Sequence, residues 1–100
     1  MPKLEVNIPH QLGQEEALRR MKEKADFLQK TYGAQATESR QDWTDNVLRF
    51  AIQAMGFKIN GSVTVEETEI RLHAELPLMA MAFKGVAERR IRQELEQMVA

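Results

Sequence analysis

Apolar and polar residues alternate along several parts of the chain, and a period of two is typical of strands with one buried face. At the N-terminus, Leu4, Val6 and Ile8 alternate with polar residues until Pro9. Three more alternating runs follow in the second half. Their apolar positions are Leu48, Phe50 and Ile52, then Phe57, Ile59, Val63 and Val65, then Ile70, Leu72, Ala74 and Leu76. These runs predict an antiparallel meander with turns at "TDN", at Gly56 and at Glu66–Glu67.

Two positions in the strand region allow more than one interpretation. Residues 35–43, which read "QATESRQDW", fit either a polar edge strand or a loop. Gly61 occupies a core-facing position of the middle strand, which favours a bulge or the close approach of a helix.

Apolar residues at helical spacing predict two helices. The first covers about residues 14–32, with Gly33 placed to close it in a left-handed conformation. Its core stripe is Ala17, Leu18, Met21, Ala25, Leu28 and Tyr32. The second ends near Met98, and because proline is tolerated at a first helical position, it can begin as early as Pro77. Its core stripe is Phe83, Ala87, Ile91, Leu95 and Met98.

The order of these elements is strand, helix, three or four strands, helix. A sheet with only one apolar face requires both helices to lie on that face. We therefore expect a single α+β domain over residues 1–100, built as a two-layer sandwich. Its antiparallel sheet has about four to five strands, with two helices on one face.

The segment "LPLMAMAF", residues 76–83, has no polar side chain. On a helical projection Leu78, Met81, Ala82 and Val86 point away from the core side, and Phe27 lies off the stripe of its own helix. Either the N-terminal strand or the chain around Trp43 covers this segment, or it is extended, or it forms an exposed contact patch. Exposed patches of this kind mark surfaces for partners, lipids or ligands.

The composition of the chain argues against several classes of protein. A net charge of −1 and 29% charged residues are ordinary for a globular protein, so we expect no nucleic-acid partner. The absence of cysteine excludes disulfides and thiolate metal sites. The N-terminus has no apolar export signal and no run approaches about 20 apolar residues, so we expect a cytoplasmic protein without a membrane span.

Candidate reaction chemistry is sparse. His10 and His73 have no second histidine at helical spacing, and His73 alternates onto the polar strand face. The sequence contains no glycine-rich phosphate loop and no nucleophile elbow. We therefore predict no catalytic residue, metal site or cofactor, and an enzyme is not the expected class.

Short motifs along nearly the whole chain resemble one family of small bacterial proteins, the polyhydroxyalkanoic acid system or granule-region proteins. The motifs are "IPHQLGQEEALRR", the "YG" that ends the first helix, "VLRFAI", "GSVTVEE", "EIRLHAELPL" and "FKGVAERRIRQELEQM". One departure is the run "PLMAMAF", which is richer in methionine than the leucine-rich run expected of this family.

The resemblance implies an association with polyester storage granules and supplies no catalytic residues. It suggests a non-enzymatic accessory protein that binds the granule surface or a granule protein through its apolar patch. A homodimer is a further way to cover the patch. Two alternatives remain, a module that binds a small apolar ligand between sheet and helices, and an enzyme acting on hydroxyacyl thioesters.

Overall fold

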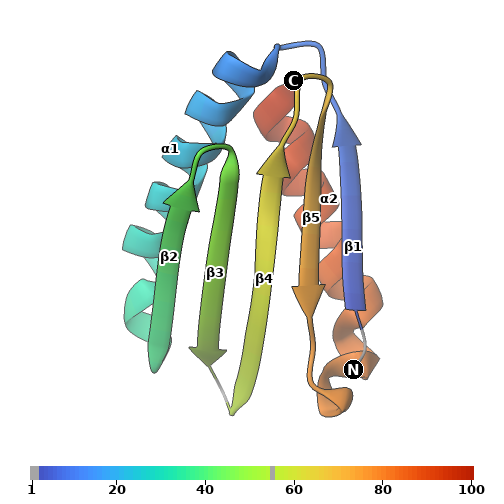
Figure 1. Cartoon of the computed structure of the whole chain (residues 1–100). Coiled ribbons are helices and arrows are strands. Elements are labelled where there is room, and N and C mark those ends of the chain that lie inside the picture. The colour runs from blue at the N-terminus through green and yellow to red at the C-terminus, as the bar shows by residue number, and fades with distance from the viewer. Residues whose placement is uncertain (1–2, 55) are drawn as a thin grey trace.

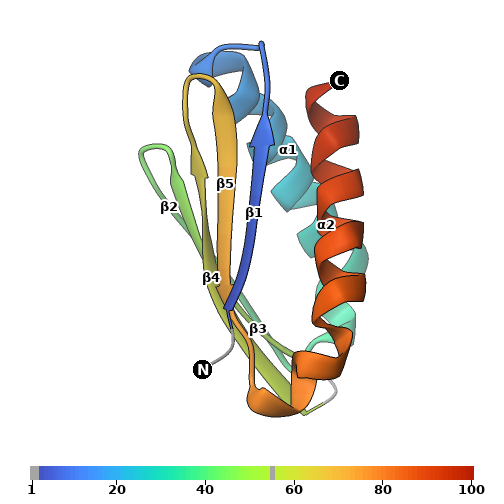
Figure 2. The ribbon, with the colours of Figure 1, turned by 90° about the vertical axis from the view of Figure 1, so that its right-hand side faces the viewer.

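The computed structural model describes residues 3–54 and 56–100, in which a five-stranded antiparallel sheet carries two helices on one face (Figures 1 and 2). The elements are β1 (Lys3–Pro9), α1 (Gln14–Tyr32), η1 (Gly33–Gln35), β2 (Glu38–Thr44), β3 (Val47–Ala54), β4 (Phe57–Val65), β5 (Glu69–Glu75), η2 (Leu78–Phe83) and α2 (Lys84–Val99), where η denotes a 3₁₀ helix. The strand order is β1-β5-β4-β3-β2. This arrangement confirms the predicted two-layer α+β sandwich.

One row of apolar residues crosses all five strands and shows how the register builds the core. Val6 pairs with Leu72, Leu72 with Val63, Val63 with Leu48, and Leu48 with Trp43. Side chains alternate between the two faces of each strand, so this register places the apolar set of every strand under the helices. The helices contribute the buried residues Ala17, Met21, Ala25 and Leu95.

The ambiguous segment before Trp43 forms the edge strand β2. Its inward positions are polar because they bond to α1. The Gln41 side-chain amide donates to the Ala25 carbonyl at 3.0 Å, and the Ser39 hydroxyl lies 2.6 Å from Gln29 Oε1. A strand that satisfies polar groups on a helix lacks the apolar alternation that identifies other strands.

Two expectations for glycines are wrong. Gly33 is right-handed, with φ −58° and ψ −33°, because the chain continues into η1 instead of ending in a left-handed cap. Gly61 is neither bulged nor approached by a helix, since strand pairing runs through it on both sides. A Cβ at Gly61 would collide with the His73 carbonyl on β5 and lie 2.7 Å from Phe50 Cζ. The neighbouring strand and the Phe50 ring therefore require glycine at this position.

The predicted core stripe of α1 is only partly buried. Leu28, Tyr32 and, on β3, Ile52 are 37–51% exposed although all belong to the predicted apolar set. The two helices diverge toward the end of the sheet where α1 ends and α2 begins (Figure 1). The sheet is therefore less completely covered there than at the opposite end.

Candidate functional site

Five large apolar side chains are exposed where the chain leaves β5 and enters α2, at the lower end of the sheet in Figure 1. Between 51% and 81% of each residue is exposed. The five are Leu78, Met79, Met81, Phe83 and Val86. Together with the exposed Ala82, they form the surface called the apolar patch below.

The 3₁₀ geometry of η2 produces this exposure. Pro77 is extended, with φ −63° and ψ 152°, so the last helix does not begin at Pro77, the earliest start that the sequence allowed. The 3₁₀ helix η2 starts at Leu78 and α2 at Lys84. The Ala80 N–H donates to the Pro77 carbonyl at 2.9 Å, and Ala80 is the buried member of η2. A 3₁₀ helix has three residues per turn, so the row of Leu78 and Met81 and the row of Met79 and Ala82 face outward beside the inward Ala80. Phe83 follows Ala80 by three residues but is exposed, because η2 ends there.

The prediction that Phe83 belongs to the core stripe of the last helix is wrong. It is 60% exposed and lies at the junction of η2 and α2, where φ is −99° and ψ is 0°. A single helical projection fails across a junction between segments of different period. The predicted stripe continues in α2 itself, where Leu95 is buried and Ile91 is partly buried. The projection therefore missed Phe83 and Met79 as patch members, although the unbroken apolar run contains both.

The patch presents side chains that bind by apolar contact alone. Full burial of a large apolar side chain contributes roughly 1.5–3 kcal/mol. While Leu78, Met81 and Val86 remain largely in water, the protein does not gain most of this free energy. Methionine is flexible and adapts to irregular surfaces. Trp43 does not cover the patch, because it lies on β2 beside Lys22, whose Nζ is 5.5 Å from the ring centroid.

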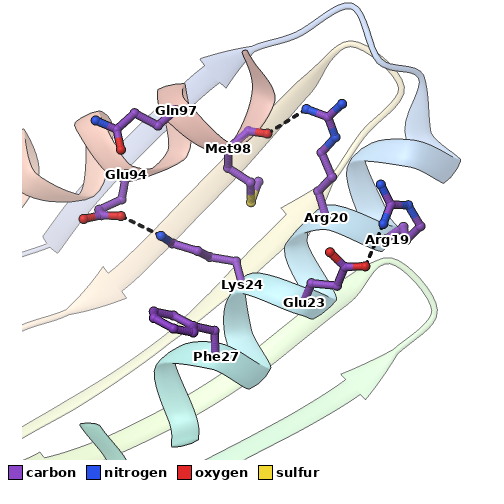
Figure 3. Close-up of a pocket in the computed structure, with 8 residues that line it drawn as sticks. All are labelled: Arg19, Arg20, Glu23, Lys24, Phe27, Glu94, Gln97 and Met98. Carbon is purple, nitrogen blue, oxygen red and sulfur yellow. Dashed lines mark hydrogen bonds and ion pairs between the residues drawn. The ribbon is translucent and has the colours of Figure 1, made fainter. Parts of the chain in front are cut away.

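Phe27 lies apart from the apolar patch. It lines a shallow cleft of about 550 Å³ between α1 and the later part of α2, together with Lys24 and Glu94 (Figure 3). Lys24 Nζ is 6.0 Å from the Phe27 ring centroid. Glu94 follows Val86 by eight residues on α2, which corresponds to about 12 Å along a helix. No patch residue lines this cleft. The structure therefore brings four of the five predicted contact residues together and places Phe27 on a different surface.

Ion pairs hold the walls of this cleft. Lys24 Nζ is 2.6 Å from Glu94 Oε2, which joins the two helices, and the hydrogen bond from Lys24 lowers the pKa of Glu94. On α1, hydrogen bonds from Arg19 and then Arg20 lower the pKa of Glu16 to about 2. These carboxylates are held ionised by their partners, a state that suits structural links.

The two histidines have different environments. His10 is buried, and its ring links two loops. Nδ1 accepts from the Leu12 N–H at 3.2 Å, and Nε2 lies 3.1 Å from the Glu66 carbonyl oxygen. Since a carbonyl oxygen only accepts, this geometry fits the neutral ring with its proton on Nε2. His73 lies on the uncovered face of the sheet, where Nδ1 is 3.5 Å from Glu5 Oε1.

Within residues 3–54 and 56–100, no group of three or more histidine, cysteine or acidic side chains is arranged to hold a metal ion. In the same part of the chain, no helix is sufficiently long and apolar to span a bilayer.

Comparison with protein families covers almost the entire chain. A family model described as "Putative polyhydroxyalkanoic acid system protein" matches residues 4–99. The chain belongs to this family. The matched range contains the buried His10, nearly all of the sheet, the apolar patch and α2, so the match to the polyhydroxyalkanoic acid system family is not confined to one motif. A comparison with curated proteins gives no match.

Proposed function

We propose that this member of the polyhydroxyalkanoic acid system family is a non-enzymatic accessory protein that binds the surface of the polyester storage granule. The apolar patch is the observation that carries the proposal. Its side chains contain no acid, base or nucleophile, so the chemistry that they offer is adsorption to an apolar surface. In the cell, the granule polymer is such a surface.

The shape of the patch supports a surface as the partner. Leu78, Met79 and Met81 project from a short 3₁₀ helix at one end of the molecule. Elements that adsorb to an apolar interface insert large apolar side chains while the polar remainder stays in water. Lys84 follows the run directly and Arg89 and Arg90 lie further along α2, so the patch adjoins a charged segment of this kind.

The test is co-sedimentation of the purified protein with washed granules. We expect wild type to pellet with granules and Met81→Lys to remain largely in the supernatant, because a charge inside the contact is desolvated without a partner. Phe27→Lys is the matched control, since it adds the same charge at a residue of similar exposure, 57% against 51%, outside the patch.

Each of three results would contradict the proposal and favour a different explanation. Equal loss of binding in Met81→Lys and Phe27→Lys would indicate a general charge effect. Binding only to granules that retain their proteins, and not to extracted polymer, would assign the patch to a granule protein. Reproducible turnover of a hydroxyacyl thioester, abolished by one polar substitution, would identify an enzyme.

A further inference from the structure

A second apolar surface lies between α1 and strands β2 to β4, on the inner side of the sheet. It encloses about 340 Å³. Its floor consists of buried residues, among them Met21, Ala25 and Leu48, and its mouth carries the partly exposed Leu28 and Ile52. We call this space the α1 groove. It is separate from the apolar patch, none of whose residues lines it.

The amide and hydroxyl side chains of Gln29, Ser39 and Gln41 along the α1 groove already have partners within the protein, and the exposed Arg40 is paired with Glu38 at 2.9 Å. Gln29 and Ser39 bond to each other, and the Gln41 amide is bonded to the Ala25 carbonyl. In the part of the chain that the structure describes, no buried side-chain nitrogen or oxygen lacks a hydrogen-bond partner. A ligand inside the groove therefore gains nothing from polar groups, because they would meet apolar walls or occupied partners.

The dimensions of the groove limit the shape of its ligand. The α1 residues that line it extend from Met21 to Tyr32, about 16 Å along a helix with a rise of about 1.5 Å per residue. About 340 Å³ over that length gives a mean cross-section of about 20 Å² and a width of about 5 Å. Carbon atoms in contact lie about 3.5–4 Å apart, so this width fits one chain of carbon atoms.

The volume sets the length of that chain. An engineered cavity of about 150 Å³ binds benzene, a molecule of six carbons. On that scale the α1 groove holds about fourteen carbon atoms if it is filled completely. A whole partner helix does not fit inside, because a helix is about 10–12 Å across and two turns of it occupy on the order of 1,000 Å³. A docked helix would therefore place only single side chains in the groove and leave most of its length unfilled.

We propose that the α1 groove binds a single unbranched aliphatic chain of roughly ten to fourteen carbons, with its head group in water at the mouth. The groove holds the chain by apolar contact. The one charged side chain of its described lining, Arg40, is already paired with Glu38, so we expect little selection for the charge of the head group. This proposal is independent of granule binding, since the two surfaces share no residue.

The experiment is calorimetric titration of the full chain with hexanol, octanol, decanol, dodecanol and tetradecanol, below the solubility limit of each, with decanoate as the charged counterpart of decanol. Affinity should rise about fourfold for each added methylene, until the chain fills the groove, and then level off. Decanol and decanoate should bind within a few-fold of each other. Affinity that rises without levelling, or saturable binding by none of these probes, would overturn the proposal.

Two variants and one spectrum locate the binding. Ala25→Leu fills the floor and should weaken decanol binding at least about tenfold, whereas Met81→Lys should bind decanol as wild type does. Because Ala25→Leu can also disturb the core, amide NMR shifts of the wild type with decanol provide an independent measurement. Shifts centred on Met21, Ala25, Leu48 and Ile52 support the groove. Shifts centred on residues 78–86, or unchanged decanol affinity in a folded Ala25→Leu protein, contradict it.

Discussion

Lys24 on α1 and Glu94 on α2 are joined by an ion pair with 2.6 Å between Nζ and Oε2, where the two helices meet (Figure 3). Arg20 strengthens the same junction by donating to the carbonyl oxygens of Met98 at 2.9 Å and Ala100 at 3.1 Å. Beyond this junction the helices diverge (Figure 1). The apolar patch lies on that side, and the α1 groove extends past the junction, since its lining on α1 begins at Met21 and ends at Tyr32. The helix junction therefore influences the geometry of both surfaces proposed to bind.

Glu94→Gln should lower the melting temperature by a few degrees, because it removes the charge that Lys24 pairs with between the helices. Glu96→Gln is the matched control, since Glu96 lies exposed on the same helix, and we expect little change. The measurement is a thermal melt followed by circular dichroism. Equal melting temperatures for Glu94→Gln and wild type would show that the pair contributes nothing measurable.

Acid should weaken the fold through the paired carboxylates. The pKa of Glu94 is lowered chiefly by Lys24, and that of Glu16 is lowered to about 2 by Arg19 and Arg20. A carboxylate whose folded pKa is depressed stabilises the protein above its unfolded pKa, and this contribution is lost as the pH falls through the folded value. The difference in melting temperature between wild type and the double variant Glu16→Gln/Glu94→Gln should therefore shrink from about pH 4.5 toward about pH 2. A difference that is constant over this window would contradict the assignment.

His10 should contribute to stability because it connects the loop after β1 to the loop before β5. In His10→Ala the partly buried Glu66 carbonyl and Leu12 N–H lose their partner, and the loss of a hydrogen bond costs about 0.5–1.5 kcal/mol. His73→Ala, on the uncovered sheet face, should change the free energy of unfolding by less than about 0.5 kcal/mol. Urea denaturation of both variants provides the comparison. A larger loss for His73→Ala than for His10→Ala would contradict these roles.

The sequence predicted the sheet because burial on one face imposes a period of two. In β5, for example, every second residue is buried, namely Ile70, Leu72 and Ala74. The edge strand β2 was ambiguous because Ser39 and Gln41 use their inward positions for hydrogen bonds to α1. An alternating pattern reveals a strand when its inward positions are apolar. It does not reveal a strand whose inward positions are polar and form hydrogen bonds with a helix.

The candidate site was predictable only in part, for a different physical reason. The apolar composition of residues 76–83 indicated an unusual surface, yet the position of Phe83 depends on where η2 ends and α2 begins. A ligand site between sheet and helices was one of the alternatives from the sequence, but the location of the α1 groove could not be predicted, because Leu28, Tyr32 and Ile52 have ordinary core spacing. Their exposure results from the divergence of two helices, which is a tertiary property.

Gly61→Ala should destabilise the protein by about 1–3 kcal/mol, a range typical of overpacked interiors. The added Cβ would meet the His73 carbonyl and the Phe50 ring. Gly85→Ala is the matched control, since a Cβ at Gly85 meets nothing within 4 Å and Gly85 lies in α2. That variant should gain up to about 1 kcal/mol because alanine favours a helix. Chemical denaturation measures both, and equal effects of the two substitutions would contradict the packing argument.

In the absence of granules, the apolar patch should be covered by a second copy of the chain. Net stabilities of small domains are of order 5–15 kcal/mol. The burial free energy that is not gained while several large apolar side chains remain in water is a considerable fraction of that range. A two-fold contact uses the same surface on both partners and closes without further growth.

Wild type should therefore elute as a dimer, with its mass determined by light scattering. Met81→Lys should elute as a monomer with a melting temperature close to that of wild type. Phe27→Lys should remain a dimer, because Phe27 lies beside Lys24 and Glu94 and not in the patch. If Met81→Lys instead melts far below wild type at an unchanged mass, Met81 supports the fold of the single chain and the patch is not the dimer contact.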